Sequence, residues 1–149
     1  MPSKISRRSA STRCRQCAAL PLSQQDGETL VMLVTSRETR RWVLPKGWIE
    51  KRISAAAQAA QEAYEEAGIR GRIGKAPIGT YAYAKRLDNG VSVPCEVVIY
   101  RLEVETLLDR WPEMGERERR WFTLEDAAAA VDEGDLGSLL LGLVSPQAA

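Results

Sequence analysis

Apolar runs separated by short polar segments predict that the chain begins with strands. The runs at 15–22 and 28–35 have the length of strands. They flank the segment SQQDG at 23–27, whose Asp-Gly pair favours a tight hairpin turn. A brief apolar stretch at 42–44 ends at Pro45, which cannot donate to a sheet ladder. We therefore expect a strand hairpin, a short third strand and a loop over 46–53.

The second half of the chain repeats this pattern with longer strands. Residues 72–86 predict a strand bent at Gly74 or Gly79, and residues 91–105 predict its partner across a turn at 88–90. A short strand at 119–122 precedes Thr123, a helix cap for residues 124–131, and a last amphipathic helix covers 136–143. The order predicts a mixed α/β domain with a helix packed on a sheet.

The helix between these halves is rich in alanine and ends in glutamates. Ser54 is its expected N-cap, and Gly68 supplies the left-handed residue after its end at Ala67. Glu62, Glu65 and Glu66 share one face, where they repel one another and oppose the helix dipole. A bound hard cation such as Mg²⁺ would compensate them, and a solvated acidic face is the alternative.

Length and composition favour one domain. The chain has 149 residues, which we divide into a flexible leader at 1–14, a domain at 15–144 and a tail at 145–149. The leader is basic and Ser-rich, and its composition is also compatible with an organelle transit peptide. No apolar run approaches the ~20 residues of a membrane span, so we expect no membrane association. The odd, small number of cysteines leads us to expect a cytoplasmic protein.

The residue types that are absent or rare exclude several chemistries. The chain has no histidine, which removes His-based catalysis and His-bound metals. Its three cysteines predict a reduced compartment without a disulfide framework. Cys14-x-x-Cys17 has the spacing of half a zinc knuckle, although core packing explains Cys17 better. Any metal is therefore expected to bind mainly oxygen ligands.

Charge is balanced overall but unevenly distributed. The net charge of +1 gives no reason to expect nucleic acid as a partner. Residues 1–46 hold nine Lys or Arg and three acids, whereas residues 103–135 hold eleven acids and four Arg. These two segments either face each other across a site for an anionic ligand and its metal, or form two solvated surfaces.

The stretch 47–69 resembles the Nudix box. Without a gap, Gly47 matches its first glycine, and Glu62, Ala63, Glu65, Glu66, Gly68 and Ile69 match its later positions. The flanks SRETRRWVLPKGWIEK and WPEMGERERRWFTLEDAA look like the diphosphoinositol-polyphosphate and diadenosine-polyphosphate branch, so the resemblance covers roughly 16–143. It implies an α/β/α sandwich with a mixed β-sheet and the box helix packed on it.

The sequence departs from the box at two positions. Ile53 stands where the box has Glu, and Gln61 stands where it has Arg. In the family these two residues commonly pair and orient the catalytic carboxylates. Losing both charges together leaves no orphan buried charge, so the fold should tolerate the change. A neutral Gln61 holds a carboxylate more weakly than Arg does, which makes reduced activity the alternative outcome.

The resemblance implies a pyrophosphohydrolase using Mg²⁺, with Mn²⁺ as an alternative. The implied metal ligands are Gly47 through its carbonyl and the three box glutamates, which also form the catalytic set: Glu62, Glu65 and Glu66. Glu62 is a ligand or a base, and an outside base among Glu113, Glu116 and Glu118 stays open. An anionic phosphorylated small molecule is the expected partner, and a homo-oligomer is compatible with the sequence. Its phosphates would bind nearby cations: Lys46, Arg37, Arg40, Arg41, Lys85 and Arg86.

Overall fold

The computed structural model describes residues 14–144, and their strands form one eight-stranded mixed sheet. Its strands are β1 (Cys14–Gln25), β2 (Glu28–Thr35), β3 (Trp42–Val43), β4 (Lys46–Trp48), β5 (Ile69–Ile73), β6 (Gly79–Arg86), β7 (Ser92–Leu107) and β8 (Arg119–Thr123). The central pair β1 and β7 is parallel, and the other pairs are antiparallel. β4 pairs with the first part of β1, so Gly47 lies opposite Cys17.

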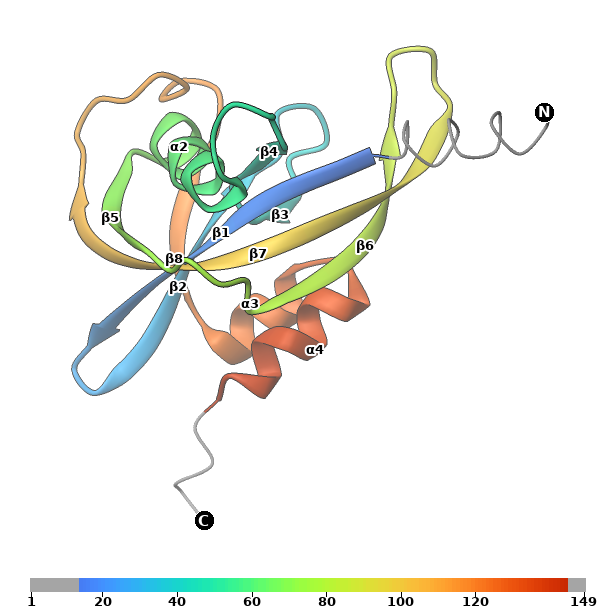
Figure 1. Ribbon diagram of the computed structural model, residues 1–149. Helices are drawn as coiled ribbons and strands as arrows, with labels where there is room; N and C mark the ends of the chain where they lie inside the picture. Colours follow the sequence, from blue (N-terminus) through green and yellow to red (C-terminus); the bar gives the residue numbers. More distant parts are fainter. Residues whose placement is uncertain (1–13, 145–149) are drawn as a thin grey trace.

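Three helices cover the two faces of the sheet. The helix α2 (Ala55–Ala67) lies on one face, and α3 (Leu124–Ala130) and α4 (Gly134–Gly142) lie together on the other (Figure 1). Each face has its own buried apolar cluster, one built on the alanines of α2 and one on the leucines of α3 and α4. This layering confirms the predicted α/β/α arrangement with the box helix on a mixed sheet. None of the helices in the described part of the chain is long and apolar enough to cross a bilayer.

The box helix begins and ends as its sequence predicts. Ser54 accepts a hydrogen bond from the Ala57 amide, which satisfies a free N–H of the first turn. Gly68 ends the helix with φ 66°, a conformation that costs glycine little. Small buried residues let the helix approach the sheet closely: Ala56, Ala59, Ala63 and Ala67. α2 therefore presents its last turns to the loop region around β4.

Several strand predictions are wrong in their bounds. The expected loop at 46–53 begins with a strand, since β4 pairs with β1. The single strand expected over 72–86 is two separate strands in the structure. β5 begins earlier, at Ile69, and ends at Ile73, and β6 begins only at Gly79. β1 begins at Cys14, the last residue of the expected leader. The rest of that leader and the tail at 145–149 lie outside the described residues.

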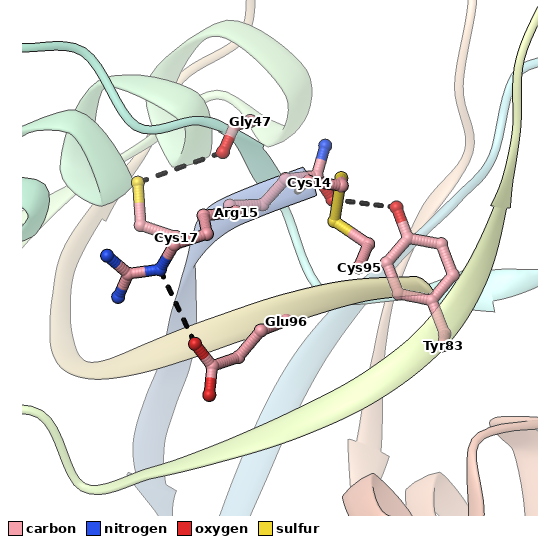
Figure 2. Close-up of a disulfide and its surroundings, with 8 residues drawn as sticks. Cys14, Arg15, Cys17, Gly47, Tyr83, Cys95 and Glu96 are labelled. Atoms are coloured by element: carbon pink, nitrogen blue, oxygen red, sulfur yellow. Dashed lines mark hydrogen bonds and ion pairs between the residues drawn. A yellow bond between two sulfur atoms is a disulfide. The ribbon is translucent and has the colours of Figure 1, made fainter. Parts of the chain in front are cut away.

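The prediction about the cysteines is also wrong. Cys14 and Cys95 form a disulfide, and they are directly opposite each other in the parallel pair of β1 and β7 (Figure 2). The spacing of cysteines along a sequence does not show which strands become neighbours, so the count alone could not find this pair. Cys17 is the free cysteine among the described residues, and it is buried in the core as expected.

Candidate functional site

The glutamates at the end of α2 differ in their surroundings. The Glu62 carboxylate accepts a 2.5 Å hydrogen bond from Gln58, one helical turn earlier. The Glu65 carboxylate accepts a 2.8 Å bond from Gln61 on the more exposed side of the helix. Glu66 is 6% exposed and lies under β4, where its carboxylate accepts a 3.3 Å bond from the Lys46 amide. The helical spacing predicted one face, and the structure divides it into a buried and an outer part.

Burial raises the pKa of both inner carboxyl groups. For Glu66 desolvation is the main cause and brings the pKa to about 8, against the opposing charge of Arg117. The pKa of Glu62 is also raised by burial, and hydrogen bonds from Gln58 and with Glu66 work against the rise. Two carboxyl groups therefore interact in a poorly solvated place. Such perturbed carboxyl groups are typical of functional sites.

Two arginines at the start of β8 compensate the charge at the helix end: Arg117 just before the strand and Arg119 as its first residue. Arg117 lies 2.7 Å from Glu113 and 3.7 Å from Glu66, and it also donates to the Thr35 carbonyl. Arg119 donates to the carbonyl of Ala67, the last residue of the helix, at 2.8 Å. A cation at this end interacts favourably with the helix dipole. From the sequence, we expect a bound cation to compensate the negative charge of the glutamates. The two arginines supply part of that positive charge.

The loop glycine of the box lies directly against the helix. A Cβ atom on Gly47 would collide with the Glu62 carboxyl group, so only glycine at position 47 allows this carboxyl group to occupy its observed position. The Gly47 carbonyl accepts from the Cys17 thiol at 3.9 Å (Figure 2). Burial raises the pKa of Cys17 to about 12, so it remains a thiol. In the metal-free protein the acidic groups at the site are therefore the carboxyl groups.

The donor set around Glu62 fits a hard divalent cation in chemistry. It consists of the Glu62 and Glu66 carboxyl groups, with the Gly47 backbone packed on the first. Within residues 14–144, no group of three potential side-chain ligands is close enough to hold a metal. The Glu65 carboxylate is hydrogen-bonded to Gln61, so it would have to break this bond to become a third carboxylate ligand.

The expected phosphate-binding arginines already have acidic partners. Arg37 pairs with Glu116 and Arg41 pairs with Asp132, each at 3.0 Å. Arg40 adopts φ 58° and donates to the Glu116 carbonyl. The basic front segment therefore contacts the acidic back segment directly through exposed ion pairs, an arrangement that neither of the two expected alternatives described. The ion pairs are exposed and contribute little stability, so a polyanion can compete for these arginines.

The expected lysines lie on a different surface. Lys46 of β4 lies over the ring of Tyr83 at 5.0 Å, and Lys85 of β6 lies over Trp48 at 5.7 Å. Arg86 follows Lys85 and lines a surface hollow with it. The candidate cations thus form two groups, three arginines between β2 and β3 and three cations along β4 and β6.

Of the candidate bases outside the box, Glu113 lies nearest the helix. Its amide donates to the Glu65 carbonyl at 3.0 Å, and its carboxylate binds Arg117. Glu116 and Glu118 form exposed ion pairs with arginines instead. Glu113 is therefore the only one of the three that shares a partner with a box glutamate among the described contacts.

Sequence reasoning missed Gln58, Arg117 and Arg119. Gln58 lies four residues before Glu62, and this helical spacing was a usable signal for the pair. The two arginines come from a segment about fifty residues later, and only the pairing of β8 with β2 brings them to the helix. No local pattern in the sequence carried that information.

Comparison with known proteins gives a consistent family. The family model described as NUDIX domain matches residues 13–140. Nudix hydrolase 12, mitochondrial, of Arabidopsis thaliana is 32% identical over 100 residues, 65% of this chain and 49% of that protein. Diphosphoinositol polyphosphate phosphohydrolase 2 of Rattus norvegicus is 28% identical over 115 residues, 76% of this chain and 60% of that protein. The chain spans about half the length of the Arabidopsis relatives it matches.

Solved structures share the fold. An Ap4A hydrolase of C. elegans has a TM-score of 0.64 at 21% identity, covering 93% of this chain and 100% of that one. The Nudix domain of Shewanella oneidensis NrtR, in complex with ADP ribose, has a TM-score of 0.65 at 17% identity and covers 90% of each chain. With the family match over residues 13–140 and Gly47, Glu62, Glu65 and Glu66 at their box positions, the chain belongs to the Nudix family.

Proposed function

We propose that the chain is a metal-dependent pyrophosphohydrolase. Its substrate would be a diadenosine polyphosphate or a diphosphorylated inositol polyphosphate. The observation that carries this is a pair of carboxyl groups at the end of α2: half-buried Glu62, which lies against Gly47, and buried Glu66, which accepts a bond from the Lys46 amide. Buried carboxyl groups with raised pKa values cost stability, and binding a cation is a use that accounts for them.

Mg²⁺, or Mn²⁺ in its place, would be held by Glu62, Glu65, Glu66 and the Gly47 carbonyl. When bound, it would neutralise phosphate charge and lower the pKa of a water molecule. Gln58 orients Glu62, and Arg117 restrains both Glu66 and Glu113. Lys46 and the arginines at 37, 40 and 41 would bind the phosphates of the substrate. Glu62 or Glu113 would accept the proton of the water.

The test compares turnover with binding. Phosphate or mononucleotide release is measured from a panel of polyphosphates with Mg²⁺, beside a Glu65→Gln, Glu66→Gln double variant. We expect metal-dependent release by the parent protein and none by the double variant. Tight ligand binding without turnover by the parent would contradict the enzyme proposal.

That second outcome corresponds to the alternative function, a module that binds nucleotides or polyphosphates. Two observations favour it. Ile53 is 43% exposed and offers no charge to the helix. Gln61 is bound to Glu65, so this glutamate is held by a neutral donor on the outer side of the helix. A Nudix fold without the Glu and Arg pair would then still bind phosphates but would hydrolyse them more slowly.

Restoring the missing pair tests this alternative. The double variant Ile53→Glu, Gln61→Arg is expected to raise the rate of metal-dependent hydrolysis, because a charged donor holds a carboxylate more firmly than an amide does. The measurement is kcat with Mg²⁺ for the parent, both single variants and the double variant. An unchanged kcat in the double variant would show that Gln58 and Arg117 already orient the glutamates sufficiently.

The glycine contact gives a sharper prediction. Gly47→Ala is expected to lower metal-dependent turnover about 100-fold, since a displacement of about 1 Å in a catalytic group costs that much. The stability should change by less than about 1.5 kcal/mol, because the group that must move is the far end of the Glu62 side chain. Gly115→Ala is the matched control, as nothing lies within 4 Å of a Cβ there. Equal activity of the two variants would contradict the proposed role of Gly47.

We also propose a cytoplasmic location, because one disulfide among three cysteines is far from the dense disulfide frameworks of small secreted domains. Immunofluorescence of the full chain in its own cells tests the location, and labelling confined to an organelle or the cell surface would contradict it.

A further inference from the structure

Cations and aromatic rings alternate on β4 and β6, and their side chains meet on the face of the sheet away from the box helix. Lys46 and Trp48 point to one face of β4, whereas Gly47 between them points to α2. Tyr83 and Lys85 occupy equivalent alternate positions on β6. Lys46 lies over the Tyr83 ring and Lys85 lies over the Trp48 ring, at 5.0 and 5.7 Å. Each strand thus contributes one cation and one ring to a shared row.

The inner half of this row is fixed in place. The Tyr83 hydroxyl donates to the side-chain carbonyl of Gln16 at 2.7 Å, and Gln16 is 4% exposed. The backbone N–H of Lys46 binds Glu66, so the row begins directly beside the inner carboxylates of α2. The backbone of Lys46 therefore lies next to the proposed cation site, while its ammonium lies over the Tyr83 ring.

The outer half of the row is open. Trp48 is 50% exposed and borders a hollow of about 520 Å³ at the 88–90 turn. The hollow is lined by Trp48, Lys85, Arg86, Leu87, Asp88 and Asn89. An indole face left half open to water, with a cation over it, has the form of a stacking surface for a flat aromatic group. A plain surface tryptophan would need neither the hollow nor the two cations beside it.

We propose that Trp48 stacks the base of a nucleoside polyphosphate whose phosphates run along Lys85 and Lys46 to the carboxylates of α2. This rests on the proposed function and narrows its substrate to the nucleotide class. A phosphorylated inositol ring has no aromatic face to stack. The carboxylate of Asp88 in the hollow would also repel its phosphates, whereas it can accept a hydrogen bond from the amino group of a base.

The test measures binding without turnover. ADP, inorganic triphosphate and inositol hexakisphosphate are each titrated against the full chain in EDTA by calorimetry. Trp48→Ala is expected to weaken ADP binding about tenfold or more while leaving triphosphate binding within about twofold, since each base stacked on an aromatic ring contributes that much affinity. Trp48→Phe should restore most of the ADP affinity, because it keeps an aromatic face.

Val91→Ala is the matched control, because Val91 is 54% exposed near the same turn but does not line the hollow. It should leave all three affinities unchanged. The proposal is overturned if Trp48→Ala weakens triphosphate as much as ADP, if it leaves ADP unchanged, or if inositol hexakisphosphate shows the same dependence on Trp48. Absence of ADP binding by the parent protein would overturn it as well.

The two proposals fail separately. Turnover of diadenosine tetraphosphate with Mg²⁺ is measured on the same preparations. If ADP binds through Trp48 but no phosphate or mononucleotide is released, the stacking site stands and the hydrolase proposal is wrong. If release occurs and its KM does not change in Trp48→Ala, the hydrolase stands and the stacking site is wrong.

Discussion

Glu66→Gln is expected to stabilise the metal-free protein at pH 8 by about 1–3 kcal/mol and to abolish its metal-dependent turnover. Burial raises the pKa of Glu66 from 4.5 to about 8, and each pKa unit corresponds to about 1.36 kcal/mol. The charged carboxylate is therefore a cost to the folded state that glutamine removes. The gain is smaller than the full shift because the variant also loses the ion pair with Arg117.

The sign of the pH dependence follows from the same shift. A carboxyl group whose pKa is raised in the folded state favours folding below its unfolded pKa, and this contribution disappears as pH rises through the folded value. The window here runs from about 4.5 to about 8. The protonated acid resembles glutamine in shape and hydrogen bonding. The two proteins should consequently be equally stable near pH 4.5 and diverge as pH rises.

The measurement is urea unfolding in EDTA at pH 5, 6.5 and 8. Glu65→Gln is the matched control, since it makes the same substitution one residue earlier, where the carboxylate is bound by Gln61 on the outer side of the helix. A Glu66→Gln protein that is less stable than the parent at pH 8, or one whose difference does not vary with pH, would contradict the assignment. Stabilisation together with lost turnover is the behaviour of a residue kept for function.

Local features of the site were readable from the sequence because they act over a few residues. The helix bounds, its caps at Ser54 and Gly68, and the shared face of the glutamates all follow from spacing along one helix. The position of Gly47 opposite Glu62 followed from the resemblance to the box, and the structure gives the reason in the missing Cβ. What could be predicted was therefore the end of α2 that carries the glutamates, and the loop before the helix.

The remaining parts depend on which strands become neighbours. Arg117 reaches Glu66 because β8 pairs with β2, and Lys46 meets Tyr83 because β4 and β6 flank the central pair β1 and β7. The short strand β4 lacks a clear sequence signal, because Pro45 precedes it and only three of its residues pair with β1. Strand adjacency of this kind has no local signal in one sequence. The disulfide depends on the same parallel pairing.

Breaking the Cys14–Cys95 disulfide is expected to lower the free energy of unfolding by about 2–4 kcal/mol. The bridge closes a loop between residues 81 positions apart, and cross-links over long loops restrict the unfolded chain most. It joins the first residue of β1 to β7, the pair on which both helical layers are built. Its loss should therefore weaken the whole domain, not only the strand end.

Urea unfolding of the parent with and without dithiothreitol, beside the Cys14→Ser, Cys95→Ser double variant, measures this. Reduction should lower the midpoint of the parent to that of the double variant and leave the variant unchanged. Cys17 should not exchange with the bridge, because it is buried and its pKa of about 12 keeps it a thiol. If the native protein alkylates at Cys14 and Cys95 before reduction, the two thiols are free. The midpoint would then be insensitive to reductant, and β1 would be held to β7 by its hydrogen bonds alone.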